Sequence, residues 1–186
     1  MKPFLFITIL LALTSCFWNY EVEDLTEEEL IWFKPFSKTA TVIYTSEKGE
    51  KDTITFNSTK IDSESVRSFE RGNYNTKYLT VNYNLTNGSY HKFALMSDGK
   101  TRYTHHFANF AKSSSHSHLE ITFIGLFFGQ KRNYLEKVND STYFFSSAKS
   151  DYSGMNVEKG IKNFTFNTRI GVVQFVDDRN IKWSRD

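Results

Sequence analysis

The sequence predicts an all-β protein, an antiparallel meander closed into a barrel or a sandwich, with one short N-terminal helix. Two observations predict this class. From Thr39 onward, short segments rich in Thr, Val, Ile, Tyr and Phe alternate with Gly, Asn, Asp and Ser, which is typical of all-β chains. Asn87-Gly88 and Asp98-Gly99 are strong hairpin signals, because both central residues of a type I′ turn need positive φ. Closure would remove exposed strand edges, giving an architecture similar to that of lipocalins.

Residues 1–15 have the features of a secretory signal peptide. Lys2 is positively charged, and residues 4–13 form an apolar run that is shorter than the roughly 20 apolar residues needed to span a bilayer. Leu13-Thr14-Ser15-Cys16 resembles the bacterial lipobox, in which cleavage would fall between Ser15 and Cys16. We therefore predict that Cys16, the only cysteine, is lipidated and begins the mature chain. An ordinary signal peptide followed by an incidental cysteine is the alternative.

The predicted lipid anchor also indicates a location. Two or three acyl chains, each contributing about 0.8 kcal/mol per buried CH₂, hold a protein stably on a membrane. An aspartate directly after the lipidated cysteine would resemble the inner-membrane retention signal of enteric bacteria. This chain has Phe17 at that position, which favours sorting to the outer membrane. We expect a bacterial envelope protein that is lipid-anchored in the outer membrane and faces either the periplasm or the cell surface. Residues 16–24 would be the lipidated tether, and residues 25–186 a single β domain.

A short helix is expected at the start of the domain. Thr26-Glu27-Glu28-Glu29 is a capping box, and its three acidic residues favour a helix N-terminus. Pro35 would end the helix, because the residue before a proline avoids the helical region. The spacing of Leu25, Leu30 and Phe33 places them on one side, where they would plug one end of the sheet.

The strands follow. We expect them near residues 39–45, 51–57, 65–71, 77–86, 89–97, 100–110, 118–128, 142–148, 161–168, 171–177 and 180–184. Two-residue turns at Asn87-Gly88 and Asp98-Gly99 would make residues 77–110 a three-stranded meander. The core face of that meander would carry Leu79, Val81, Tyr83, Leu85, Tyr90, Ala94, Met96, Tyr103 and Phe107. The other face would be largely wet, with Thr80, Asn82, Asn84, His91, Arg102, Thr104 and His106, although Phe93 and Leu95 also fall on it.

The aromatic content is high, with 18 Phe, 10 Tyr and 3 Trp. Residues 118–128 end in a run that is apolar on both faces, which predicts a central strand or one that lines a cavity. A thick core explains these residues. The alternative is a barrel whose mouth admits an apolar or sugar ligand.

Histidines suggest the strongest candidate for a metal site. The register places His91 opposite His106, and His116, His118 and Glu120 share the outer face if Leu119, Ile121 and Phe123 point inward. A cross-strand cluster of this kind could bind zinc, which takes three or four N, O or S ligands. The spacing matches no zinc motif, and histidines on a wet sheet face are the simpler interpretation.

Catalytic motifs and cofactor motifs are absent from the sequence: it contains no Gly-x-Ser-x-Gly, His-Glu-x-x-His, P-loop or dinucleotide-binding pattern. Asp177-Asp178 could be a paired-carboxylate site, but a solvated polar turn between the last two strands is favoured. The charged string 47–52 predicts a hairpin tip. A net charge of +2 lacks the basic surface of nucleic-acid binders, so nucleic acid is not an expected partner.

Two sets of motifs lie at the ends of the predicted mature chain: Leu25-Thr26-Glu27-Glu28-Glu29, Trp32, Pro35-Phe36 and the hairpin 49–56 at one end, and Phe166, the strand 171–175 and Trp183 at the other. In these motifs the chain resembles a family of small uncharacterised Bacteroidota lipoproteins. Ser37-Lys38 replaces the glycine usual in that family, and the last turn also lacks its glycine. The resemblance implies an envelope location and a β fold, and it does not point to any particular activity. Asp52-Thr53-Ile54 and Asp140-Ser141-Thr142 look like the O-glycosylation sites of such bacteria.

We therefore predict a binding or interaction module of the cell envelope, anchored through its lipid. Its ligand is left open between a glycan, an apolar molecule and another envelope protein. A metal-dependent or catalytic envelope protein that uses the His91, His106 and His118 face is the alternative. A structural component of the envelope without a ligand is a third hypothesis.

Overall fold

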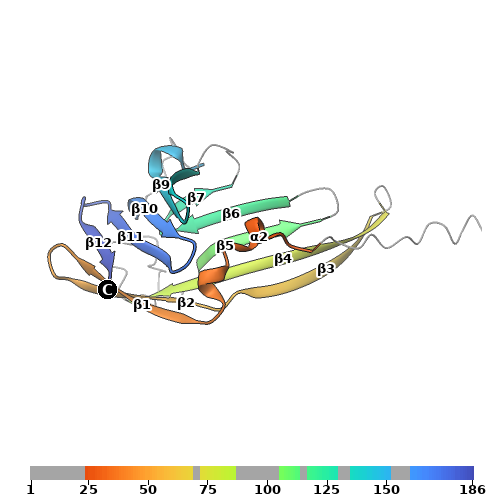
Figure 1. Ribbon diagram of the computed structural model, residues 1–186, viewed down its shortest axis with the longest axis horizontal. Helices are drawn as coiled ribbons and strands as arrows, with labels where there is room; N and C mark the ends of the chain where they lie inside the picture. Colours follow the sequence, from red (N-terminus) through yellow and green to blue (C-terminus); the bar gives the residue numbers. More distant parts are fainter. Residues whose placement is uncertain (1–23, 69–71, 87–104, 114–116, 130–134, 152–159) are drawn as a thin grey trace, which may run out of the picture.

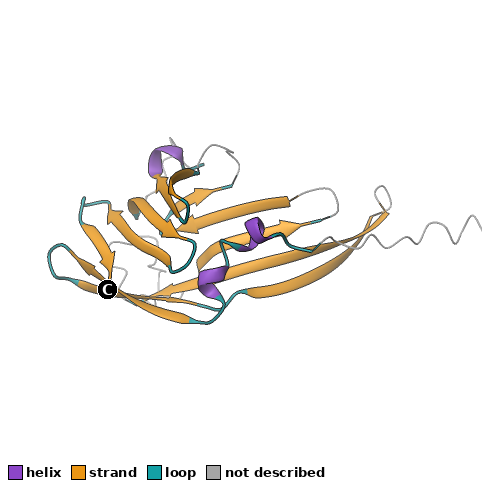
Figure 2. Cartoon of the chain, in the orientation of Figure 1, coloured by secondary structure: helices purple, strands orange, loops and turns teal. Residues whose placement is uncertain are grey.

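A computed structural model describes residues 24–68, 72–86, 105–113, 117–129, 135–151 and 160–186. They form one antiparallel sheet that curls around its own core (Figure 1). Helix is limited to short segments near the N-terminal end and after β9 (Figure 2). The prediction of an all-β, barrel-like fold is confirmed. Because the strands belong to a single sheet, the chain curls rather than stacking two separate sheets.

Twelve strands make up the described sheet. Their bounds are β1 (Ala40–Ser46), β2 (Lys51–Phe56), β3 (Lys60–Ser68), β4 (Gly72–Leu85), β5 (His105–Lys112), β6 (Ser117–Phe123), β7 (Leu126–Phe128), β8 (Glu136–Asn139), β9 (Thr142–Ser146), β10 (Ile161–Asn167), β11 (Gly171–Asp177) and β12 (Lys182–Arg185). Along the sheet the order is β7-β6-β5-β4-β2-β1-β12-β11-β10-β9-β8, and β3 pairs with β4. Most strands lie close to their expected positions, but β3 begins earlier than expected and β8 was not predicted.

Strand β4 corrects the predicted meander. Its 14 residues are enough to pair with two strands one after the other along one edge, first β3 and then β2. On the other edge, β5 pairs with β4 from Lys77 to Tyr83. The edge of residues 77–83 that the expected meander assigned to 89–97 is therefore occupied by β5. A turn signal is local, and it does not reveal which distant strand will occupy an edge. Strand 89–97 and the turns Asn87-Gly88 and Asp98-Gly99 lie outside the described residues.

The predicted core face of β4 is nevertheless confirmed, because side chains alternate whichever strand is the partner. Leu79, Val81, Tyr83 and Phe107 are buried, and Leu85 is partly buried. Asn82 and His106 lie opposite each other on the outer face. The remaining members of the predicted core face, Tyr90, Ala94, Met96 and Tyr103, fall outside the described residues.

The expected strand 118–128 is in fact a hairpin of β6 and β7. Its turn is Ile124-Gly125, with φ values of 42° and 82°, between the paired residues Phe123 and Leu126. A β-branched residue rarely adopts positive φ, so Ile124-Gly125 is not a recognisable turn signal. The Ile124 side chain is buried and its amide donates to the Tyr83 hydroxyl at 2.8 Å. The apolar run is thus explained by a buried turn, and β7 is an end strand rather than a central one.

The N-terminal helix α2 (Glu27–Leu30) starts with the predicted capping box. The Glu29 amide donates to the Thr26 hydroxyl at 3.3 Å, and the Thr26 amide donates to the Glu29 carboxylate at 2.7 Å. Pro35 lies one turn later, inside the 3₁₀ helix η1 (Lys34–Phe36), rather than ending α2. Of the predicted residues, Phe33 is buried, and Leu25 and Leu30 are partly buried against the core. Trp32 and Phe36, which follow α2, are buried as well, so this segment packs on the core of the curled sheet.

Candidate functional site

The interior of the curled sheet is occupied by aromatic rings. Phe164 of β10 is fully buried and stacks on Phe145 of β9 with ring centroids 4.5 Å apart. It also reaches Phe123 of β6 at 5.1 Å and Phe107 of β5 at 6.5 Å. Rings from distant parts of the sheet therefore meet in the middle. Of the two interpretations of the aromatic content, the thick core matches the described interior.

Rings from the N-terminal segment cover the same core. Trp32 stacks on Phe166 with centroids 5.5 Å apart, and Phe36 lies 5.0 Å from Phe56 and 5.2 Å from Phe107. Close-packed aromatic pairs of this kind add about 0.5–1.5 kcal/mol each beyond their burial. The space where a lipocalin-like barrel would hold its ligand is filled here by the chain's own side chains.

Side-chain hydrogen bonds link the end strand β7 to the segment that follows β9. We call Ser150 and Asp151 the closing segment. The Phe127 carbonyl accepts from the Asp151 amide at 2.8 Å and from the Ser150 hydroxyl at 3.0 Å, and the Gly129 amide donates to the Asp151 carboxylate at 2.7 Å. The closing segment thus satisfies the edge of β7 that a neighbouring strand would otherwise satisfy.

The histidine prediction is met only in part. His118 and Glu120 share the outer face, with the His118 Nε2 atom 3.1 Å from the Glu120 carboxylate. Along β5, however, His106 lies five residues from Ala111, the residue opposite His118, which is about 16 Å at 3.3 Å per residue. His91 and His116 lie outside the described residues. Within the described part of the chain, no three His, Cys, Asp or Glu side chains come together as metal ligands.

Asp177 is not part of a solvated turn, contrary to the sequence-based interpretation. Its side chain is fully buried, and only residues 178–180 form the exposed turn. The carboxylate accepts from the Arg179 guanidinium at 2.8 and 3.0 Å, from the Ile181 amide at 2.9 Å and from the Trp183 indole at 3.2 Å. A turn residue was expected to be hydrated, but Trp183 six residues later supplies a buried donor that sequence spacing did not reveal.

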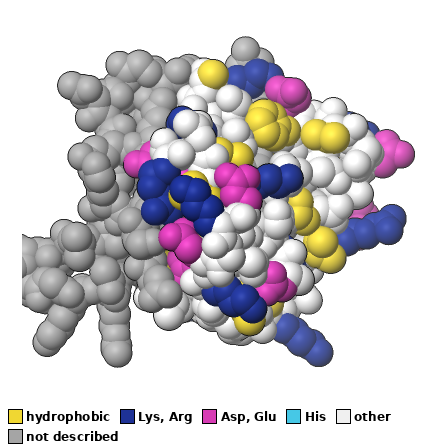
Figure 3. All heavy atoms as spheres, turned by 90° about the vertical axis from the view of Figure 1, so that its left-hand side faces the viewer, with side chains coloured by type: hydrophobic (Ala, Val, Ile, Leu, Met, Phe, Trp, Pro, Cys, Tyr) yellow, Lys and Arg dark blue, Asp and Glu magenta, His cyan; other side chains and the backbone are white. Residues whose placement is uncertain are grey.

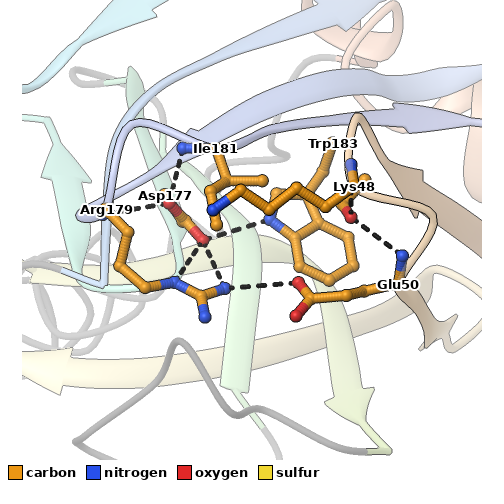
Figure 4. Close-up of polar contacts among 7 residues, drawn as sticks. Lys48, Glu50, Asp177, Arg179, Ile181 and Trp183 are labelled. Atoms are coloured by element: carbon orange, nitrogen blue, oxygen red, sulfur yellow. Dashed lines mark hydrogen bonds and ion pairs between the residues drawn. The ribbon is translucent and has the colours of Figure 1, made fainter.

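Arg179 connects this carboxylate to the β1–β2 turn. Figure 4 shows the guanidinium between Asp177 and Glu50, whose carboxylate lies 3.6 Å away. We call Glu50, Asp177, Arg179 and Trp183 the turn cluster. Burial alone would raise the pKa of the Asp177 carboxyl, but hydrogen bonds from Ile181, Arg179 and Trp183 outweigh burial and lower that pKa. The ionised carboxylate therefore holds the two turns together, which is a structural role.

Charges at this end of the molecule are mixed. Figure 3 faces the end that carries the β1–β2 and β11–β12 turns, and it shows basic and acidic side chains interspersed. Lys48, Glu50 and Arg179 are near neighbours there (Figure 4). Such a surface has no single-sign field of the kind that steers a charged polymer. This agrees with the net charge of +2.

A buried ion pair fixes the start of the domain. Lys112 of β5 donates to the Glu29 carboxylate and to the Asp24 carbonyl, both at 3.0 Å. Its side chain is 10% exposed and that of Glu29 19%. Burial raises the pKa of Glu29, but hydrogen bonds from Thr26 and Lys112 outweigh it, and the pKa is lowered. Lys77 adds a second contact, to the Asp24 carboxylate at 2.9 Å.

The two expected modification motifs differ in their surroundings. Asp52 is buried within β2, next to the partly buried Thr53. Asp140 is exposed in the turn between β8 and β9, and the Ser141 hydroxyl accepts from the Asn167 side chain at 3.3 Å. The second motif is therefore the more accessible one. Ser15 and Cys16 lie outside the described residues, so lipidation remains a prediction.

Within the described ranges, no helix is long and apolar enough to cross a membrane. Comparisons with protein-family models, with curated proteins and with solved structures find no match for this chain. Its function therefore has to be argued from its own residues.

Proposed function

We propose that this protein is a lipoprotein anchored in the bacterial outer membrane that acts as a binding module and contacts its partner on the outer surface of its β domain. The observation that carries the proposal is the aromatic core. Phe107, Phe123 and Phe164 meet where a ligand-binding barrel would have its cavity. Interiors packed in this way resemble crystals of small molecules and leave few voids. A partner would therefore bind outside.

The start of the domain supports the anchoring part of the proposal. Asp24 is held by Lys77 and Lys112, so a tether from Cys16 would join the domain at a fixed point. Asp24 is the eighth residue after Cys16, so the two positions lie at most about 28 Å apart when the tether is fully extended. The anchor would keep the domain close to the bilayer, where its partners would be other envelope components.

Metabolic labelling tests the anchor. In cells that receive radiolabelled palmitate, the wild-type protein should become labelled and should sediment with outer membranes. Cys16→Ser should abolish both properties, while Ser15→Ala, which keeps a small residue before the cysteine, should preserve them. Equal labelling of wild type and Cys16→Ser would overturn the anchoring proposal.

Photo-crosslinking in intact cells tests binding on the outer surface. A photoreactive residue replaces Ser184 on β12 or His106 on β5, both exposed, in the full lipidated protein. We expect a discrete adduct with an envelope component from at least one of these positions. The matched control replaces Lys48, in the β1–β2 turn, to measure adducts formed by random collision. Adducts at control level from every outward position tested would overturn the proposal.

A further inference from the structure

Strand β3 has an open edge. It has nine residues, and its backbone pairs with β4 without a register shift, from Lys60 opposite Thr80 to Ser68 opposite Gly72. Among the described strands, none pairs with its other edge, and Figure 1 shows β3 as the outer strand beside β4. At about 3.4 Å per residue, this edge is about 30 Å long and presents backbone donors and acceptors that another strand can pair with.

The other open positions of the sheet are protected against strand addition. The closing segment satisfies the edge of β7. Strand β8 has only four residues, its register shifts between Lys137 and Asn139, and its Glu136 is bonded to Lys149. Short length and bulges are devices that keep sheet edges from pairing. Residues 60–68 have neither device and contain no proline, so β3 is the edge best suited to accept a strand.

The side chains of β3 give this edge a charge pattern. Every side chain from Lys60 to Ser65 is exposed. Alternation places Asp62 and Glu64 on one face together with Lys60, and neither carboxylate forms an ion pair with another described side chain. The other face carries Ile61, which is 66% exposed. The edge therefore combines two free acids with one open apolar side chain.

We propose that the free edge of β3 binds an extended segment of a partner envelope protein as an added antiparallel strand, an inference that rests on the proposed function. In strand addition, backbone hydrogen bonds supply affinity and alternate side chains supply specificity. The antiparallel order is chosen because antiparallel pairs are slightly more stable than parallel ones.

The charge pattern defines the partner's sequence. Opposite charges on directly facing residues stabilise a strand pair and like charges destabilise it. The partner should therefore have basic residues opposite Glu64 and Asp62 and an apolar residue opposite Ile61. From its N-terminal side it would be basic, any residue, basic and apolar. A second copy of β3 cannot meet this requirement, because its basic residues, Lys60 and Arg67, are not two positions apart.

A peptide as long as β3 tests the edge. In antiparallel register, Thr-Thr-Thr-Thr-Lys-Thr-Lys-Val-Glu places lysines opposite Glu64 and Asp62, valine opposite Ile61 and glutamate opposite Lys60. The labelled peptide is added to the purified full-length protein in detergent and followed by fluorescence anisotropy. We expect saturable binding. A peptide in which both lysines are replaced by glutamate, and one with the same residues in reverse order, should each bind about tenfold more weakly.

Charge reversal in the protein tests the assignment to β3. The double variant Asp62→Lys with Glu64→Lys should lose the lysine peptide and prefer the glutamate peptide. The matched control, Glu47→Lys with Asp178→Lys, makes the same charge change at exposed turn positions and should bind like wild type. Thermal melts of both variants show whether a loss of binding is a loss of folding.

Backbone methylation separates strand addition from charge attraction alone. Two forms of the lysine peptide carry N-methyl groups on alternate residues, so that each form blocks one backbone edge without changing any charge. The form blocked on the edge that faces β3 should lose binding, and the other should keep it. Equal binding of both forms and the parent peptide would overturn the strand proposal.

The proposal is also overturned if the lysine peptide does not bind, if the double variant at Asp62 and Glu64 still prefers it, or if a photoreactive residue at Ser63 joins a second copy of the chain instead of the peptide. Envelope adducts from Ser184 or His106 in the cellular crosslinking experiment, together with no peptide binding, would overturn the strand proposal and leave the binding-module proposal standing.

Discussion

Phe164→Ala removes the ring at the centre of the aromatic core. Phe164 is fully buried, and its ring lies 4.5 Å from Phe145, 5.1 Å from Phe123 and 6.1 Å from Phe128. Truncating a buried phenylalanine costs about 3–5 kcal/mol, because transfer free energy is lost and a cavity remains. We expect a cost of about 4 kcal/mol, since the surrounding rings come from separate strands and cannot collapse together. With an m-value of about 2 kcal/mol/M, the urea midpoint would fall by about 2 M.

Urea unfolding followed by tryptophan fluorescence measures this cost, because Trp32 and Trp183 are both buried. Ile61→Ala is the control, since Ile61 is 66% exposed and surface changes stay within about 0.5 kcal/mol. A loss of less than about 1 kcal/mol for Phe164→Ala would refute the reasoning. It would mean that the rings surround free space rather than packing on one another.

Three further substitutions test the turns and the domain start. Asp177→Asn should cost about 1–3 kcal/mol in urea unfolding, because the amide replaces one accepting carboxylate oxygen with an NH₂ group that faces the surrounding donors, whereas Asp178→Asn in the exposed turn should stay within about 0.5 kcal/mol. The pKa of Asp177 is lowered in the folded state, so its stabilisation is present above the unfolded pKa of about 3.9 and is lost as the pH falls through the folded value. A difference between wild type and Asp177→Asn that persists unchanged in strong acid would contradict this assignment. Lys112→Met should cost about 1–3 kcal/mol, because Glu29 loses a partly buried partner, and should speed amide exchange in α2; unchanged exchange would show that the ion pair does not hold the helix. Gly49→Ala should cost about 1 kcal/mol or slightly more, because Gly49 has a φ of +81°, although the space around it is open. A melting temperature equal to that of wild type in calorimetry would contradict this prediction.

Local rules predicted much of this fold. The period of two along β4 identified Leu79, Val81 and Tyr83 as core residues, and the capping box identified the start of α2 correctly. These features depend on neighbouring residues alone. The partner of β4 could not be predicted in the same way, because strand pairing depends on contacts between distant segments.

The same distinction between local and distant contacts applies to the site residues. The outward placement of His118 and Glu120 followed from alternation, but the buried environment of Asp177 depends on Trp183 and on Arg179 folding back over the turn.

The packed interior is the central claim, and xenon tests it most directly. A crystal of the wild-type protein under xenon pressure should show no xenon atom between Phe107, Phe123 and Phe164, because xenon enters only apolar cavities that are already open. A Phe164→Ala crystal treated in the same way should gain one at the position of the missing ring. Xenon at full occupancy among these three rings in the wild-type protein would contradict the account. It would show an open apolar cavity and favour ligand binding inside the curled sheet.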